Sequence, residues 1–157
     1  MGVGLTFAEA YRKAQLGANN AIPESGTAFI SVRDPDKAAA VKVASGLAML
    51  GFDIVATRGT ALMLEEAGVP VTAVNKVREG RPHNVDMIKN GGIQMIINTT
   101  EGREAIADSA EIRSSAESNG VYYTTTIAGG AAVVDALARG QEDGVHRLQE
   151  MHEELYE

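Results

Sequence analysis

Short apolar runs alternate along the chain with longer segments in which apolar residues recur every three or four positions. The first pattern is typical of buried strands, and the second is typical of amphipathic helices. Strands are predicted at 27–32, 53–56, 69–74, 94–98 and 121–124. Helices are predicted at 35–51, 60–67, 83–90, 103–118 and 129–139. The alternation predicts an α/β, three-layer Rossmann-like fold with a five-stranded parallel sheet.

Two segments lie outside this alternating unit. A capping-box pattern starts a helix at Thr6, and the helix ends near Gly17, ahead of a linker. Near the far end, apolar residues recur at helical spacing at Val145, Leu148, Met151 and Leu155. An isolated amphipathic helix needs a surface to pack on. We therefore divide the chain into 1–22 and 23–157, and expect a part of a larger protein or a homo-oligomer.

All five predicted strands end in polar residues, rich in hydroxyls and amides. Sheets of this kind bind ligands at the carboxyl ends of their strands. At one end, Gly59 stands between Thr57 and Thr60 where a strand meets a helix, an arrangement that lets N–H and hydroxyl groups converge on an anion. The local alternative is a plain helix start, with Thr60 as N-cap and Gly59 as a turn residue. Together, the five ends favour a shared site for an anionic ligand.

Two lysines supply positive charge close to these ends. Lys37 lies in the first turn of a predicted helix, where the helix dipole disfavours a cation unless an anion is bound. The alternative to a bound anion is that Asp34 and Asp36 neutralise the charge of Lys37. Lys76 directly follows the third strand. It either contacts the anion or is a solvated surface lysine.

Asn98 and Thr100 follow the fourth strand and either contact the ligand or cap the next helix. An amide offers the donor and acceptor that a base or carbonyl requires. No Asp or Glu is expected beside the strand ends to pair with His83. The sequence therefore indicates no general base that is oriented by a carboxylate. No Ser/His/Asp set, metal motif or Walker loop is present. The predicted site therefore binds a ligand without transforming it.

Composition narrows the function classes further. A chain of 157 residues suits one domain, and the absence of cysteine fits a reducing cytoplasm. The net charge of −7 argues against a nucleic-acid surface, and no apolar run is long enough to span a membrane.

Four strings carry a family resemblance: FISVRDPDK at 29–37, ATRGT at 56–60, VNKVREGRPH at 74–83 and IINTT at 96–100. They resemble the C-terminal allosteric domain of the carbamoyl-phosphate synthase large subunit. Residues 149–152 are similar to the closing helix of that subunit, and 6–16 to the end of its preceding synthetase domain. The resemblance thus covers nearly the whole chain.

The resemblance implies a methylglyoxal-synthase-like fold that carries no chemistry itself. It implies binding of nucleotide effectors, UMP as inhibitor and IMP as activator, which control carbamoyl phosphate synthesis for pyrimidines and arginine. The rest of the large subunit and the glutaminase small subunit would be partners. ATP, Mg²⁺ or Mn²⁺ and K⁺ would belong to the synthetase domains, leaving no cofactor here. The implied nucleotide contacts are Ser31, Lys37, Thr57, Gly59, Thr60, Lys76, Asn98 and Thr100.

The fifth strand departs from the family pattern. Members activated by ornithine have Tyr-Asp-Thr-Thr there, whereas this chain has Thr124 in place of the Asp, between Tyr123 and Thr125. An ornithine site at these residues would lack its carboxylate. An alternative function is a methylglyoxal synthase-type phosphate lyase, which needs Asp residues at places that read Arg-Pro-His (81–83) and Asn-Thr-Thr (98–100) here. A purely structural oligomerisation domain is a third, which the polar strand ends disfavour.

Overall fold

The computed structural model describes residues 1–76, 79–80, 83–101, 103–139, 144–145 and 147–154. The chain divides into two compact units: Pro23–Ala131 forms one, and Met1–Ile22 together with Ala132–Glu157 forms the other. The sheet lies in the first of these units. The division of the chain into 1–22 and 23–157 stays a prediction.

A five-stranded parallel sheet forms the centre of the larger unit. In spatial order the strands are β3 (Thr72–Val74), β2 (Asp53–Thr57), β1 (Thr27–Ser31), β4 (Met95–Asn98) and β5 (Tyr122–Thr124). The α/β fold and the parallel sheet are confirmed. The third strand begins later than predicted, and its first pair joins Val55 to Thr72. Pro70 lacks the N–H that a ladder requires, which explains the late start.

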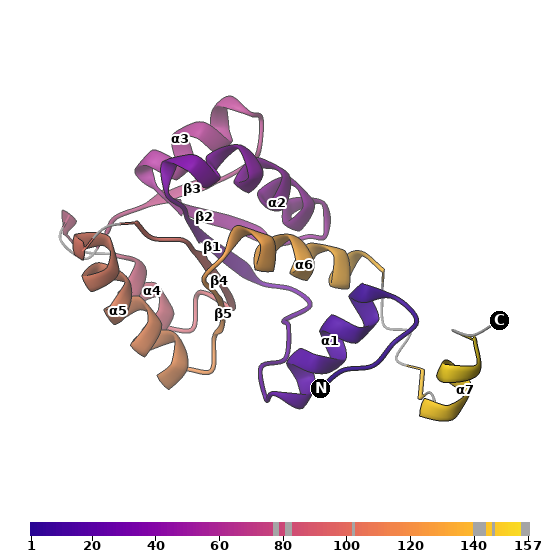
Figure 1. The fold of residues 1–157 in the computed structure, drawn as a ribbon. Helices are drawn as coiled ribbons and strands as arrows, with labels where there is room; N and C mark the ends of the chain where they lie inside the picture. The colour runs from indigo at the N-terminus through magenta and orange to yellow at the C-terminus, as the bar shows by residue number, and fades with distance from the viewer. Residues whose placement is uncertain (77–78, 81–82, 102, 140–143, 146, 155–157) are drawn as a thin grey trace. The chain divides into compact units, whose positions relative to one another are not determined.

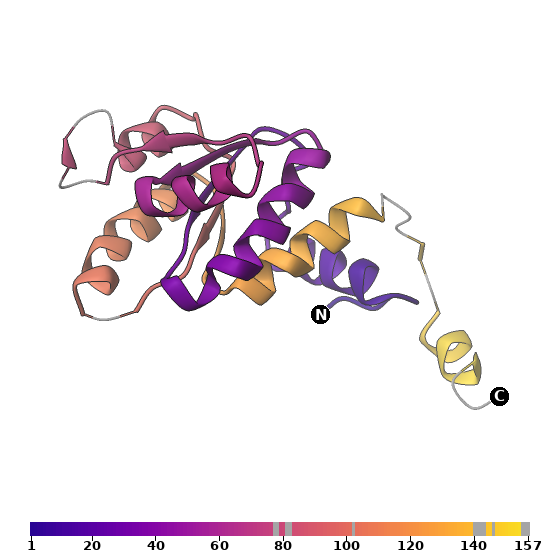
Figure 2. The same cartoon turned by 90° about the horizontal axis from the view of Figure 1, so that it is seen from above.

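Helices cover both faces of this sheet, as Figures 1 and 2 show. α2 and α3 lie on one face, and α4 and α5 on the other. Their bounds are η1 (Asp34–Asp36), α2 (Lys37–Met49), α3 (Arg58–Glu66), α4 (Asn84–Lys89) and α5 (Arg103–Ser118), with α6 (Ile127–Ala138) after β5. The sheet with a helical layer on each side confirms the three-layer architecture.

The start of α3 differs from the predicted one. The helix begins at Arg58, so Thr57 is the N-cap and its side chain makes no capping hydrogen bond. Thr60 lies inside the first turn and is buried, and Gly59 has no positive φ. The local alternative, with Thr60 as N-cap and Gly59 as a turn residue, was therefore wrong, and the helix begins two residues earlier than predicted.

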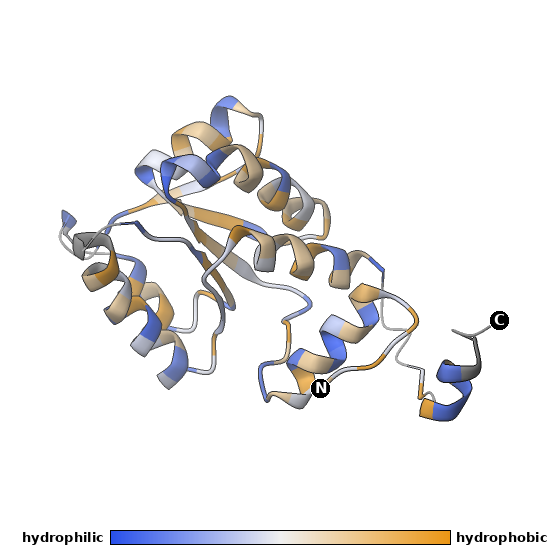
Figure 3. Cartoon of the chain, viewed as in Figure 1, coloured by the Kyte–Doolittle hydropathy of each residue, from blue (hydrophilic) through white to orange (hydrophobic). Residues whose placement is uncertain are grey.

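A buried apolar cluster joins the sheet to α4 and α5. Strand residues Phe29, Val55 and Ile96 pack there with helix residues, namely Val85, Ile88, Ile112 and Ala116. Figure 3 shows largely apolar strands between helices that carry both polar and apolar residues. Because side chains alternate along a strand, the residues two places after each of these strand residues face the same side. Those residues, Ser31, Thr57 and Asn98, begin the functional site.

The described part of the other unit contains α1 (Phe7–Gly17), the second half of α6 and α7 (Leu148–Glu154). The predicted cap is present, since the Thr6 hydroxyl accepts from the Glu9 N–H at 3.2 Å. Of the predicted C-terminal stripe, Leu148 is largely exposed and residue 155 lies outside the described residues. None of the helices that the structure describes is long and apolar enough to cross a membrane.

Candidate functional site

The sheet register places three polar strand ends side by side. Ser31 pairs with Asn98 of β4, and it lies one place beyond the pair that joins Ile30 to Ala56 of β2. Ser31 therefore stands between Thr57 and Asn98 on the face that α4 and α5 cover. Two hydroxyls and one amide form a row at the carboxyl edge of the sheet.

This row lines a pocket of about 380 Å³. Loops after β1, β3 and β4 and residues of α4 and α5 complete its wall. Its lining residues are Ser31, Val32, Arg33, Asp34, Thr57, Lys76, Asn84, Asn98, Thr99, Thr100, Glu101, Ser109 and Ile112. Five of the eight predicted contacts line it: Ser31, Thr57, Lys76, Asn98 and Thr100. Lys37, Gly59 and Thr60 do not line the pocket.

Thr60 connects two elements behind the pocket wall. Its hydroxyl accepts from Thr57 Oγ1 at 3.3 Å and from the Val32 N–H at 3.4 Å. Thr57 Oγ1 in turn lies 3.4 Å from Ser31 Oγ. Thr60 is only 2% exposed, so its hydroxyl positions Thr57 and the end of β1. The first turn of α3 leaves open space beside Gly59, where an added Cβ would meet no atom within 4 Å.

The amide of Asn98 forms the inner end of the row. Its Nδ2 donates to Ser109 Oγ of α5 at 3.0 Å and to Tyr123 Oη of β5 at 2.9 Å. Both amide protons are thereby used within the protein, and Oδ1 is left for a ligand. Tyr123, which we expected on an ornithine side, holds Asn98 in place.

The other two residues of that expected ornithine site lie away from the pocket lining. Thr125 is exposed, and Thr124 Oγ1 contacts the Thr126 carbonyl at 3.5 Å. Thr126 Oγ1 accepts from the Gly129 N–H at 3.0 Å, which starts α6. Thr124 in place of the family Asp still argues against an ornithine site at Tyr123 and Thr125.

The charges around the pocket include carboxylates. Arg33 and Lys76 line it, and so do Asp34, which begins η1 after β1, and Glu101, which lies in the loop after β4. The expectation that no carboxylate lies beside the strand ends was therefore wrong. Asp34 and Glu101 each follow the last residue of their strand by three positions, so both remain near the carboxyl edge of the sheet.

Ion pairs partly satisfy these charges. Lys37 Nζ lies 2.8 Å from Asp34 Oδ1, and a hydrogen bond with the lysine holds the pKa of this carboxyl below its usual value. Arg33 Nε donates to Asp36 Oδ2 at 2.7 Å, which lowers the pKa of Asp36 and raises that of Arg33. The side chain of Asp34 is 88% exposed, so its pair with Lys37 is weak and open to exchange.

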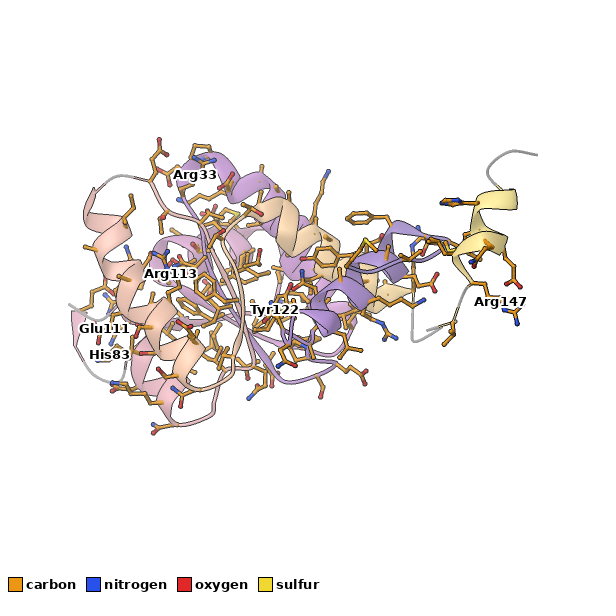
Figure 4. The ribbon with its side chains drawn as sticks, turned by 60° about the horizontal axis from the view of Figure 1, so that its bottom comes forward. Arg33, His83, Glu111, Arg113, Tyr122 and Arg147 are labelled. Atoms are coloured by element: carbon orange, nitrogen blue, oxygen red, sulfur yellow. The ribbon has the colours of Figure 1, made fainter. Side chains whose placement is uncertain are left out.

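One pocket residue, Asn84 at the start of α4, was not predicted from the sequence. Asn75 and His83 form a parallel bridge, and the His83 side chain accepts from the Asp86 N–H at 3.3 Å. Asn84, the first residue of α4, follows and lines the pocket. Arg33 and His83, labelled in Figure 4, mark the loops after β1 and before α4. Residues 77–78 and 81–82 of the family string lie outside the described residues.

Two residues of α5 also line the pocket without having been predicted. Ser109 and Ile112 are three apart, so they share one face of the helix. The spacing indicates only the shared face, and the fold turns this face towards the pocket. Among the residues that the structure describes, no group of three acidic, His or Cys side chains is placed to hold a metal ion.

The sequence was also compared with known proteins. A model of the family of MGS-like domains matches residues 39–125, which is more than half of the chain. The carbamoyl phosphate synthase large chain of Pseudomonas aeruginosa is 59% identical over 152 residues. The large chain of Pseudomonas putida is 57% identical over 152 residues, and that of Halomonas eurihalina 56% over 155.

Each of these matches covers 97% of this chain but only 14% of the relative. The chain thus spans about one seventh of the length of the curated relatives it matches. The parallel sheet with flanking helices agrees with the family that the model describes. The chain belongs to the family of MGS-like domains, and over nearly all of its length it is similar to carbamoyl phosphate synthase large chains.

Proposed function

We propose that the pocket binds a nucleoside monophosphate effector, UMP or IMP, and that the domain regulates carbamoyl phosphate synthesis. One observation carries the proposal: the pocket joins a hydroxyl-rich, cationic end to an amide and apolar end. A phosphate suits the first, and a base suits the second. The chemistry of synthesis, with its ATP and metal ions, would then belong to other parts of a large chain, in the cytoplasm and together with a glutaminase small subunit.

The phosphate is expected at the junction of β2 with α3. Thr57 and Ser31 offer hydroxyls there, and the first backbone N–H groups of α3 lie beside them. Lys76 adds a charge-assisted contact. Lys37 joins once the phosphate replaces Asp34 as its partner, because their exposed ion pair is weak.

The ribose and base are expected towards α4 and α5. Asn98 Oδ1 and the Thr100 hydroxyl are polar partners for them, and Ile112 provides an apolar wall. Ser109 and Tyr123 hold the Asn98 amide before any ligand arrives, which lowers the ordering cost of binding.

A lyase reaction on dihydroxyacetone phosphate is the second candidate, because Asp34 and Glu101 line the pocket. A carboxylate that removes a proton from carbon needs a raised pKa to be an effective base. The pKa of Asp34 is instead lowered by Lys37. This disfavours Asp34 as that base.

Isothermal titration of the purified chain tests the proposal. We expect UMP and IMP to bind and uridine to bind at least tenfold more weakly, because uridine lacks the phosphate. Lys76→Ala should weaken UMP binding about tenfold or more. Lys89→Ala, an exposed lysine in the last turn of α4, is the control and should leave the affinity unchanged.

Failure of both nucleotides to bind would refute the effector assignment. Incubation with dihydroxyacetone phosphate, followed by an assay for methylglyoxal, tests the second candidate. Release of methylglyoxal that is lost in Asp34→Asn would establish the lyase instead.

A further inference from the structure

We infer that Asn84 reads the base of the bound nucleotide by donating a hydrogen bond from Nδ2 to a carbonyl oxygen. The pocket would thereby prefer keto bases, such as uracil and hypoxanthine, to amino bases such as cytosine and adenine. The inference rests on the proposed function, because it assigns a specificity residue to the same pocket.

Asn84 is a buried polar residue that nevertheless lines the pocket. It is 1% exposed, and it stands next to Val85 and near Ile88 in the apolar cluster under α4. A buried amide group is costly unless it finds a hydrogen-bond partner. The partners of its two polar atoms therefore indicate what Asn84 does.

The orientation of this amide follows from its neighbour. Asn84 Oδ1 accepts from the backbone N–H of Val85 at 2.9 Å. A backbone N–H can only donate, so the atom facing it must be the oxygen. The remaining atom, Nδ2, is therefore a donor.

Nδ2 has no acceptor among the residues that the structure describes. No fully buried side-chain nitrogen or oxygen in that part of the chain lacks a partner. The unpaired Nδ2 must therefore carry exposed surface, although only 1% of Asn84 is exposed. Since Asn84 lines the pocket, Nδ2 is available to donate a hydrogen bond to a ligand there.

The backbone around Asn84 holds this donor in place. Its own N–H donates to the Asn75 carbonyl at 3.1 Å, directly after β3. The capping box of His83 and Asp86 fixes the first turn of α4, to which Asn84 belongs. A donor on such a support is pre-organised, so a ligand without an acceptor leaves it unpaired.

The surroundings favour a planar base as the source of the acceptor. Ile112 offers an apolar wall, and Asn98 Oδ1 is a second polar atom in the same pocket. A keto oxygen accepts from Asn84, whereas an exocyclic amino group at the same ring position would place donor against donor. Sites built to pair one polar group reject ligands that leave it unpaired.

Titrations with matched nucleotide pairs test this inference. UMP and CMP differ at one ring position by oxygen against an amino group, and IMP and AMP differ in the same way. We expect the unmodified chain to bind UMP at least tenfold more tightly than CMP, and IMP more tightly than AMP.

Asn84→Asp is the decisive variant. It retains an oxygen for the Val85 N–H, so α4 should still form, but it replaces the donor by an acceptor. A new negative charge weakens all four nucleotides together, and the UMP-to-CMP affinity ratio cancels that effect. We expect this ratio to fall to about one or below, and Asn84→Leu to abolish the preference as well. Asn90→Asp, at the exposed end of α4, should retain the ratio.

An unchanged UMP-to-CMP ratio in Asn84→Asp and Asn84→Leu would overturn the role of Asn84 while leaving the effector site intact. Equal affinity for UMP and CMP in the unmodified chain would overturn it as well. Failure of all four nucleotides to bind would instead reject the proposed function and, with it, this inference. Circular dichroism of each variant confirms that the fold is retained.

Discussion

The ion pair of Asp34 and Lys37 lies beside the pocket, because Asp34 lines it, and the carboxylate competes with a bound anion for Lys37. Asp34 lines the pocket, and its partner Lys37 does not. A phosphate of charge close to −2 attracts the lysine more strongly than one carboxylate does, and it is repelled by the same carboxylate. At the scale of single residues, affinity for a phosphate therefore depends on how easily the phosphate displaces Asp34 from Lys37.

We expect Asp34→Asn to tighten UMP binding by about 1.5-fold to fivefold, the range for exposed pairs. The change removes one repulsive charge and frees Lys37. Uridine, which has no phosphate, should bind the variant and the unmodified chain equally. Titration of both ligands measures this, with Asp53→Asn at the opposite end of β2 as the control. Weaker UMP binding in Asp34→Asn would show that Asp34 serves the ligand directly.

The same pair gives a pH dependence of known sign. Lys37 lowers the pKa of Asp34 in the folded state, and Arg33 lowers that of Asp36. Both pairs therefore stabilise the fold above the unfolded-state pKa of aspartate, and this contribution is lost as pH falls through the lowered values. The neutral range in which nucleotides are titrated leaves both pairs formed.

At the scale of elements, one buried hydroxyl holds β1, β2 and α3 together. Thr60 of α3 accepts from the backbone of Val32 and from Thr57. This contact fixes the hydroxyl row before a ligand binds. The order of the pocket therefore depends on a residue outside its lining.

Thr60→Val tests this dependence, because it keeps the shape of the side chain and removes the hydroxyl. We expect a loss of about 1–3 kcal/mol in the free energy of unfolding, since the Val32 N–H loses its acceptor. UMP binding should weaken as well, because Thr57 loses the partner that orients it. Urea unfolding monitored by circular dichroism measures the first effect. Thr72→Val, at an exposed position of β3, should change stability by less than about 0.5 kcal/mol.

The alternation of strands and helices along the chain and the polar strand ends were predictable because both are visible in the local residue pattern. Alternation within β1, β2 and β4 brings Ser31, Thr57 and Asn98 to one face, a relation present in the residue spacing itself. The start of α3 was predicted two residues too late because threonine is a favourable N-cap residue. Thr60 instead lies inside the helix, where its hydroxyl accepts a hydrogen bond from the backbone of Val32. Local patterns do not encode such a contact between distant segments.

The pocket residues that escaped prediction were placed by long-range structure. Asn84 is buried because a bridge between Asn75 and His83 brings α4 under the sheet edge. Asp34 and Glu101 line the pocket three positions beyond the ends of β1 and β4. The family resemblance identified the ligand class to test, whereas the structure was needed to place a buried, unpaired donor in the pocket.

At the scale of the whole molecule, the pocket lies within only one of the two compact units. Its lining residues all belong to Pro23–Ala131, whereas α1 belongs to the unit of Met1–Ile22 and Ala132–Glu157. A ligand that binds only the folded form stabilises what it contacts by mass action. The two units should therefore respond differently to the same nucleotide.

Hydrogen exchange with and without UMP measures this difference. At a free UMP concentration of 100 times its Kd, amides of β1, β2 and β4 that exchange through unfolding of their unit should slow by about 100-fold. Amides of α1 should keep their rates, because that helix belongs to the other compact unit. Equal slowing in both units would show instead that the chain unfolds as one cooperative body. In that case the effector signal would reach α1 through the stability of the whole chain, and a substitution that destabilises the sheet, such as Thr60→Val, should speed exchange in α1 as well.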